Sequence, residues 1–191
     1  SHTCLLLLKK GYELIVIDSF INSSRRSFEN IRRILNHENI YFEDRIHIFE
    51  FDLRSEAKLD EVFLIFLSKG KPIEGVIHFA GLKCVADSIV NPINYWDCNL
   101  NSTINLIKIM EKYKCYSLVF SSSASIYKPS NKLAINELDE ISPITPYGKT
   151  KASIENFLND IIRSNVENWK IANLRYFNPI SSHPSGLLKE T

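Results

Sequence analysis

Short apolar runs rich in β-branched residues alternate with longer amphipathic segments along this chain of 191 residues. The runs that predict β-strands are 13–18, 46–51, 75–79, 117–121 and 170–175. The segments that predict helices are 26–36, 57–69, 94–113 and 148–164. Continuously apolar runs are typical of strands covered by helices on both faces. The alternation therefore predicts right-handed βαβ crossovers and an α/β fold with a doubly wound parallel sheet.

The beginning of the chain restricts this fold further. Residues 3–10 read as the rest of a helix that leads into the strand 13–18, and no predicted strand precedes that helix. In the dinucleotide-binding, Rossmann-like fold, a first strand leads through a glycine-rich turn into the first helix. The chain has only 6 glycines and begins with Ser1 rather than methionine. We therefore expect residues 1–191 to form a partial Rossmann-like domain without its first strand and glycine-rich turn.

The composition argues against several classes of protein. With 23 basic and 22 acidic residues, the formal net charge is +1, so there is no electrostatic reason to expect nucleic acid or a membrane surface as a partner. No apolar run approaches the roughly 20 residues of a membrane-spanning helix. The four cysteines form no Cys-x-x-Cys pair, and the histidines show no metal-ligand spacing. We expect reduced cysteines, no metal site and a cytoplasmic location.

Two aspartates stand at the ends of predicted strands. Asp18 is followed by the polar loop 19–24, where a carboxylate can accept hydrogen bonds from both ribose hydroxyls and would repel a 2′-phosphate. This position favours NAD over NADP, although an acidic helix cap would look the same. Asp52 ends the next strand, and there adenine contact and helix capping are equally consistent with the sequence.

The strongest local signal is Tyr147 followed four residues later by Lys151, at the start of a helix that Pro146 suits. At this spacing the two side chains share one helix face. A phenol is a poor base at neutral pH, and a neighbouring ammonium group favours its ionised form. Ser121–Ser123 end a predicted strand about 24 residues upstream, where strand ends line the ligand crevice of a parallel sheet. A hydroxyl there could meet Tyr147, while a polar turn is the alternative reading.

Five stretches of the chain together resemble the UDP-glucose 4-epimerases, a family of extended short-chain dehydrogenases/reductases. These stretches are Ser1–Thr3 (SHT), Phe79–Lys83 (FAGLK), Ser121–Ala124 (SSSA), Pro146–Lys149 (PYGK) and Arg175–Gly186, which begins RYFNP. The resemblance covers essentially the whole chain. The family's glycine-rich turn ends directly before the first stretch, and its carboxy-terminal region closes over the substrate beyond residue 191. We therefore expect a fragment that folds poorly and does not turn over substrate by itself.

The resemblance also implies roles for individual residues. Tyr147 is similar to the catalytic base, Lys151 to the lysine that lowers its pKa and holds the nicotinamide ribose, and Ser123 to the hydroxyl that bridges Tyr147 and the sugar. Asn178 is similar to a contact of the UDP-sugar. The other implied cofactor contacts are Asp18, Ser19, Asn22 and Ser23 at the ribose, Asp52 and Leu53 at the adenine, Phe79, Ala80, Gly81, Leu82, Lys83 and Asn99 beside the cofactor, and Phe177 at the nicotinamide.

The implied reaction interconverts UDP-glucose and UDP-galactose, a step of galactose metabolism, through transient oxidation at sugar C4 by tightly bound NAD. In the family, Tyr147 would take the proton of the 4′-hydroxyl while C4′ gives up a hydride. The 4-keto sugar would then turn over and take the hydride back on its other face. The resemblance also implies a homodimer. The helix that carries Trp96 would supply its interface, or would simply pack into the core.

Two alternatives remain open. Nucleotide-sugar 4,6-dehydratases resemble this chain but place an Asp-Glu pair directly after the serine or threonine position, where this chain has Ala124 and Ser125. Neither residue can act as an acid or a base, so the sequence favours the epimerases. The other alternative is an inactive fragment that acts at most as a binding or assembly piece.

Overall fold

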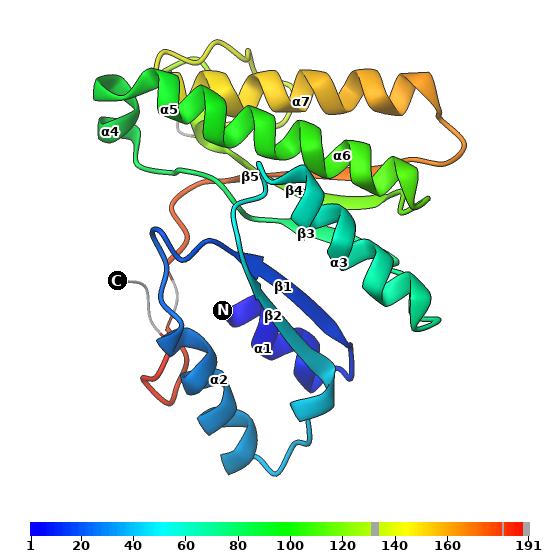
Figure 1. The fold of residues 1–191 in the computed structure, drawn as a ribbon. Helices are drawn as coiled ribbons and strands as arrows, with labels where there is room; N and C mark the ends of the chain where they lie inside the picture. Colours follow the sequence, from blue (N-terminus) through cyan, green and yellow to red (C-terminus); the bar gives the residue numbers. More distant parts are fainter. Residues whose placement is uncertain (131–133, 181, 189–191) are drawn as a thin grey trace. The chain divides into compact units, whose positions relative to one another are not determined.

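The computed structural model describes residues 1–130, 134–180 and 182–188, and it contains two compact units. One unit is Ser1–Asp52 together with Asn178–Thr191, and the other is Leu53–Phe177. Each unit has a parallel sheet with flanking helices (Figure 1). The expected α/β, Rossmann-like class is therefore confirmed. No helix of the described residues combines the length and the apolar character needed to cross a membrane.

The first unit holds a two-stranded sheet. β1 (Leu14–Asp18) pairs in parallel with β2 (Ile46–Glu50), so Asp18 lies opposite Glu50 at the carboxyl end. Its helices are α1 (His2–Lys9), α2 (Arg26–His37) and the short 3-10 helix η1 (Glu43–Arg45). An apolar cluster joins α1 and α2, with Leu5, Leu8, Ile31, Ile34, Leu35, Phe42 and Leu188 buried in it. Leu188 brings the last described residues into this core, and the Asn30 side chain donates to the Leu187 carbonyl at 2.8 Å.

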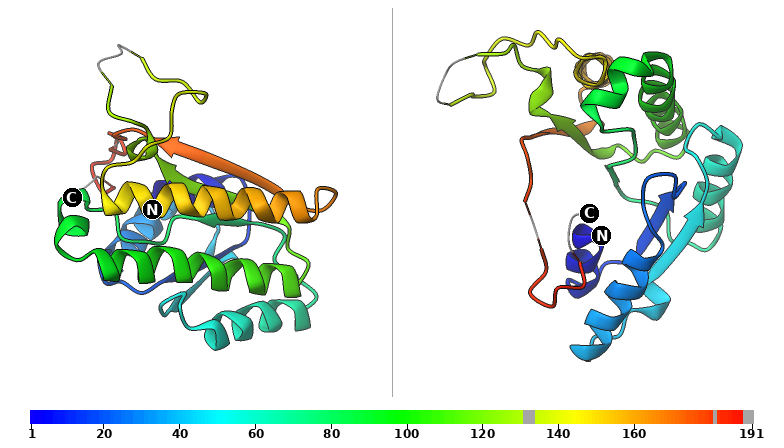
Figure 2. Two further views of the ribbon diagram at one scale, coloured as in Figure 1. Left: turned by 90° about the horizontal axis from the view of Figure 1, so that it is seen from above. Right: turned by 90° about the vertical axis from the view of Figure 1, so that its left-hand side faces the viewer.

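The second unit holds a three-stranded parallel sheet in the order β3-β4-β5. The strands are β3 (Val76–His78), β4 (Ser117–Ser123) and β5 (Lys170–Tyr176). Three helices lie side by side along one face of this sheet (Figures 1 and 2): α3 (Glu56–Ser68), α6 (Ser102–Lys112) and α7 (Pro146–Ser164). The buried side chains of Leu118 and Phe120 on β4 point into this layer.

The helix that follows the long loop after β4 has clear local causes. Pro146 occupies its first turn, where no backbone donor is required, and the Thr145 hydroxyl accepts a hydrogen bond from the Gly148 backbone at 3.2 Å. Ile154 and Leu158 on the predicted apolar stripe are buried. These features place the first turns of α7 beside the carboxyl end of β4.

The helical stretch predicted at 94–113 is confirmed, with a feature that the sequence did not indicate. It runs without interruption through α5 (Pro92–Trp96), the π-helical turn η2 (Asp97–Asn101) and α6, and a short helix α4 (Val85–Val90) precedes it. In the second unit, some strand side chains lie outside the helical layer of that unit. Ile77 and Leu174 are 40% and 41% exposed, because the helices of this unit lie on one face of its sheet.

Candidate active site

Ser123 and Tyr147 come together where β4 ends and α7 begins. The Ser123 side chain lies near enough to the Tyr147 phenol to lower its pKa, and both residues are buried, at 8% and 9% exposure. The meeting predicted from strand-end geometry is therefore present. Ser123 is further fixed because its hydroxyl accepts the backbone N–H of Ser125 at 3.2 Å, at the start of the 3-10 turn η3 (Ala124–Ile126).

Lys151 lies one helical turn after Tyr147 and is also buried, at 5% exposure. Its ammonium group donates to the Ser121 carbonyl at 2.8 Å and lies 4.8 Å from the centre of the Phe120 ring and 5.9 Å from that of Tyr147. Burial lowers the pKa of Lys151 to about 8, because the charged form loses hydration that one carbonyl and two ring faces replace only in part. Lys151 therefore places a buried positive charge near Tyr147, the base that the family resemblance implies.

The pKa of the Tyr147 phenol is set by two opposing effects. Burial raises it, because the phenolate is less well solvated inside the protein. The hydrogen bond with Ser123 lowers it, because that bond stabilises the ionised form. The family resemblance implies that Lys151 also lowers the pKa of Tyr147, and this effect stays a prediction. The structure by itself holds Tyr147 protonated at neutral pH.

Asn99 organises part of the segment 79–83, for which the family resemblance implies a position beside the cofactor. Its side-chain amide donates to the Leu82 carbonyl at 3.1 Å and to the Thr150 hydroxyl at 3.2 Å, and its oxygen accepts the Leu82 N–H at 2.8 Å. Gly81 has a φ of +146°, and a Cβ there would lie 2.8 Å from the Asn99 oxygen and 4.0 Å from the Lys151 nitrogen. The 81–82 backbone therefore runs close to Lys151, where only glycine fits.

The remaining predicted contacts of the second unit are spread along the same strand ends. Phe79 is half-exposed just after β3, followed by the partly buried Ala80, while Lys83 is exposed. Leu53 is buried. Phe177 directly follows β5 and is 60% exposed.

In the first unit, Asp18 ends β1 as predicted and shapes the loop that follows. One of its carboxylate oxygens accepts the Phe20 N–H at 2.8 Å and the Ser23 hydroxyl at 2.9 Å. Phe20 adopts a φ of 55°, which turns the chain sharply there. The partly buried Ser19 and the exposed Asn22 lie in the same loop. Asp52 and Asn178, two further predicted contacts, also belong to this unit.

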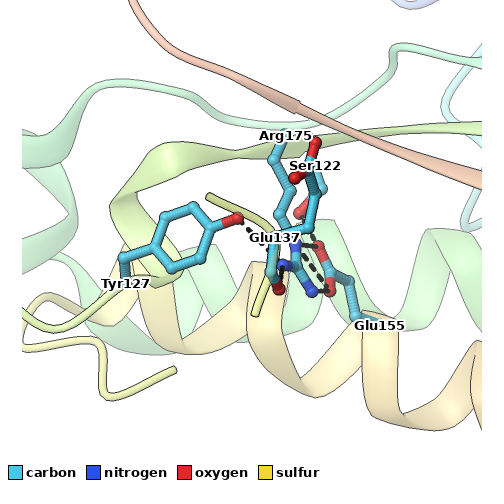
Figure 3. Close-up of polar contacts among 5 residues, drawn as sticks. All are labelled: Ser122, Tyr127, Glu137, Glu155 and Arg175. Atoms are coloured by element: carbon cyan, nitrogen blue, oxygen red, sulfur yellow. Dashed lines mark hydrogen bonds and ion pairs between the residues drawn. The ribbon is translucent and has the colours of Figure 1, made fainter. Parts of the chain in front are cut away.

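The sequence does not indicate a polar cluster that joins α7 to β4 and β5. Glu155 lies on the apolar face of α7, at 3% exposure, and pairs with Arg175 on β5 (Figure 3). Thr150 was also missed, although its hydroxyl links Asn99 to the Tyr147 carbonyl at 2.8 Å. The available signal was a charged residue within an apolar helical stripe, because such a residue must find a partner in the interior.

Comparison with known proteins identifies close relatives. Residues 1–190 match the sequence model of the NAD dependent epimerase/dehydratase family. UDP-glucose 4-epimerase 2 of Arabidopsis thaliana is 40% identical over 190 residues, which is 100% of this chain and 51% of the relative. UDP-glucose 4-epimerase of Bacillus subtilis is 39% identical over 190 residues, again 100% of this chain and 52% of the relative. The chain thus spans about half the length of the curated relatives it matches.

Solved structures agree with these relatives. UDP-glucose 4-epimerase from Bifidobacterium longum, in complex with NAD+ and UDP, matches with a TM-score of 0.87 and 38% identity, over 99% of this chain and 53% of that one. The enzyme from Stenotrophomonas maltophila, with bound NAD and formylated UDP-arabinopyranose, matches with a TM-score of 0.87 and 32% identity, over 100% of this chain and 53% of that one.

Proposed function

Because the chain belongs to the NAD dependent epimerase/dehydratase family, we propose that the protein interconverts UDP-glucose and UDP-galactose by inverting the configuration at sugar C4. The observation that carries this proposal is the buried trio of Ser123, Tyr147 and Lys151 at the end of β4 and the start of α7. The 40% identity to a UDP-glucose 4-epimerase along the whole chain supports the choice of substrate.

The residues present fit NAD as the cofactor. Asp18 offers an acidic acceptor at the end of a parallel strand, as adenosine ribose recognition requires, and Ser19, Asn22 and Ser23 lie in its loop. Gly81 leaves room for a group to approach the backbone beside Lys151. When bound, NAD would supply reversible hydride transfer at C4. The other residues proposed to hold it are Asp52, Leu53, Phe79, Ala80, Leu82, Lys83, Asn99 and Phe177.

In this proposal the proton chemistry belongs to the trio. Tyr147 takes the proton of the sugar 4′-hydroxyl and returns it after inversion. Ser123 already contacts the phenol and would bridge it to the sugar oxygen. The Lys151 ammonium stabilises the phenolate, which offsets the effect of burial on the pKa of Tyr147. Asn178 would contact the UDP-sugar.

We also propose a homodimer. Apolar side chains on α4 and α5 are solvent-exposed, with Ile89 62%, Val90 78% and Ile93 84% exposed. Strongly exposed apolar side chains on two neighbouring helices are consistent with an interface with another protein. Sedimentation analysis of the wild type and of an Ile93→Asp variant tests this, since a dimer through this surface would dissociate in the variant.

The product identity tests the proposed function. The full polypeptide that the gene encodes is incubated with UDP-galactose without added cofactor, and the products are identified by NMR. We expect UDP-glucose and a stable mixture of the two sugars. A 4-keto-6-deoxy sugar would identify a dehydratase instead, and an unchanged substrate would favour a binding or assembly role. The absence of acidic groups at Ala124 and Ser125 supports the first outcome.

A further inference from the structure

Glu155 on α7 and Arg175 on β5 form an ion pair (Figure 3). The Arg175 Nη2 donates to the Glu155 Oε2 at 2.8 Å, and its Nε lies 3.1 and 3.2 Å from the two carboxylate oxygens. The pair is largely withdrawn from solvent, with side-chain exposures of 19% for Arg175 and 3% for Glu155. This two-point contact fixes both the distance and the orientation of the two side chains.

The same pair joins four segments of the second unit. Ser122 on β4 donates its hydroxyl to Glu155, which lies on α7, while Arg175 comes from β5. The Arg175 Nη1 also donates to the Tyr127 hydroxyl at 2.9 Å and to the Glu137 carbonyl at 3.0 Å. Both acceptors belong to the loop between β4 and α7. The pair therefore connects that loop, α7, β4 and β5 through contacts of two side chains.

The attachment points lie directly beside the candidate catalytic groups. Ser122 is the neighbour of Ser123 and points to the opposite face of β4, because successive side chains alternate along a strand. Glu155 lies one helical turn after Lys151, and two turns after Tyr147. Any sliding or rotation of α7 on the sheet would change the separation between Tyr147 and Ser123.

Apolar packing alone leaves such movements weakly restricted. Contacts such as those of the buried Ile154 and Leu158 contribute an attraction that is not directional. A bidentate arginine–carboxylate pair is directional, and a lysine cannot reproduce its planar fork. The cluster thus adds a bidentate, directional contact between α7 and the sheet to the single hydrogen bond that Lys151 donates to the Ser121 carbonyl.

Building on the proposed function, we propose that Ser122, Glu155 and Arg175 are positioning residues. They hold α7 in register with β4, so that the Tyr147 hydroxyl meets Ser123 and the Lys151 ammonium group stays beside them. They touch neither substrate nor cofactor in this proposal. Their effect on catalysis passes through the placement of Tyr147.

The test separates this role from simple stabilisation. Removing one partner leaves a buried unpaired charge, whereas replacing both with apolar residues of similar size is often tolerated. The Glu155→Leu/Arg175→Met double variant is therefore made in the full polypeptide, with Lys112→Met as a control that removes the exposed pair with Asp60. The measurements are the urea midpoint, kcat and KM, and the ultraviolet titration of Tyr147, isolated by subtracting the same protein carrying Tyr147→Phe.

We expect the double variant to keep a urea midpoint near that of the wild type and a nearly unchanged KM. Its kcat should fall on the order of 10- to 100-fold, the scale of a small misplacement of a catalytic group. Tyr147 should titrate at higher pH, because its hydrogen bond with Ser123 weakens. A folded double variant with wild-type kcat and an unchanged Tyr147 titration would overturn the proposal.

If the double variant does not fold, Arg175→Lys tests the proposal instead. This variant keeps the positive charge and loses only the planar, bidentate contact with the Glu155 carboxylate. The measurements are again kcat and the ultraviolet titration of Tyr147. We expect a lower kcat and a titration of Tyr147 at higher pH, and wild-type values of both would contradict the proposal. If the wild type itself converts no UDP-galactose, the proposed function fails. The Tyr147 titration then still tests the positioning role by itself.

Discussion

The Lys151 ammonium group donates a 2.8 Å hydrogen bond to the carbonyl oxygen of Ser121, two residues before Ser123 on β4. This contact links the lysine of the candidate site to the strand that carries its serine. It also holds a positive charge in a place that is 95% shielded from solvent, since Lys151 is only 5% exposed. The arrangement therefore costs stability whenever Lys151 is charged.

The first prediction concerns the pH dependence of that cost. Burial lowers the pKa of Lys151 from 10.5 to about 8, so between these values the unfolded chain binds more protons than the folded one. The free energy of unfolding of the wild type, measured relative to Lys151→Met, should therefore be constant below pH 8. It should rise by about 1.4 kcal/mol per pH unit from pH 8 to 10.5.

Urea unfolding at several pH values measures this difference. Lys149→Met provides the matched control, because Lys149 is an exposed lysine of the same helix. That variant should follow the wild type across the range. A Lys151→Met difference that does not change with pH would contradict the buried, charged state described here.

A second prediction concerns Gly148, in the first turn of α7. A Cβ at this position would overlap the Ser125 carbonyl oxygen and would lie 3.0 Å from the Pro143 Cβ. Gly148→Ala should therefore lower the free energy of unfolding by about 1–3 kcal/mol, the usual cost of overpacking. Without this overlap, alanine would instead stabilise a helix by up to about 1 kcal/mol.

Gly75→Ala is the control for this substitution, because a Cβ there would meet only ordinary contacts, the nearest being the Ser117 Cβ at 3.4 Å. It should change stability by less than about 0.5 kcal/mol. Thermal unfolding of both variants is sufficient. Equal stability of Gly148→Ala and the wild type would show that α7 does not begin this close to Ser125.

A third prediction tests Asn99 as the clamp of the 81–82 segment. Asn99→Ala removes the partners of both the N–H and the carbonyl of Leu82, as well as a contact to Thr150. The free energy of unfolding should fall by about 2–3 kcal/mol, the cost of leaving buried polar groups unpaired. Asn101→Ala, which loses only an exposed contact to Asp97, should stay within about 0.5 kcal/mol of the wild type. Similar effects of the two substitutions would refute the clamp.

The sequence was most informative where local chemistry decides the structure. Pro146 and the apolar stripe of α7 predicted the helix, and the strand ends placed Ser123 near Tyr147. Both inferences rest on periodicity and on the edge that parallel strands share, so neither requires knowledge of distant contacts.

Features that depend on tertiary partners were not predictable in the same way. The π-helical turn at Asp97–Asn101 lies within a segment whose pattern is that of a continuous helix, and its buried Asn99 contacts Leu82 and Thr150, which are remote in sequence. The Glu155–Arg175 pair joins a helix and a strand, and nothing local indicates which charge meets Glu155. The contact between Tyr147 and Ser123 was expected, but the opposing effects of burial and hydrogen bonding on the pKa of Tyr147 required the structure.

The most direct test of the central claim is the rate at which Tyr147→Phe converts UDP-galactose to UDP-glucose, measured with its bound NAD. Tyr113→Phe is the control, since that hydroxyl donates to the Asp60 carbonyl at 3.4 Å and contacts none of the three candidate catalytic residues. If Tyr147 moves the 4′-hydroxyl proton, its variant should retain NAD and lose at least about 100-fold in kcat, while the control keeps wild-type activity. Full activity in Tyr147→Phe with NAD retained would contradict the account.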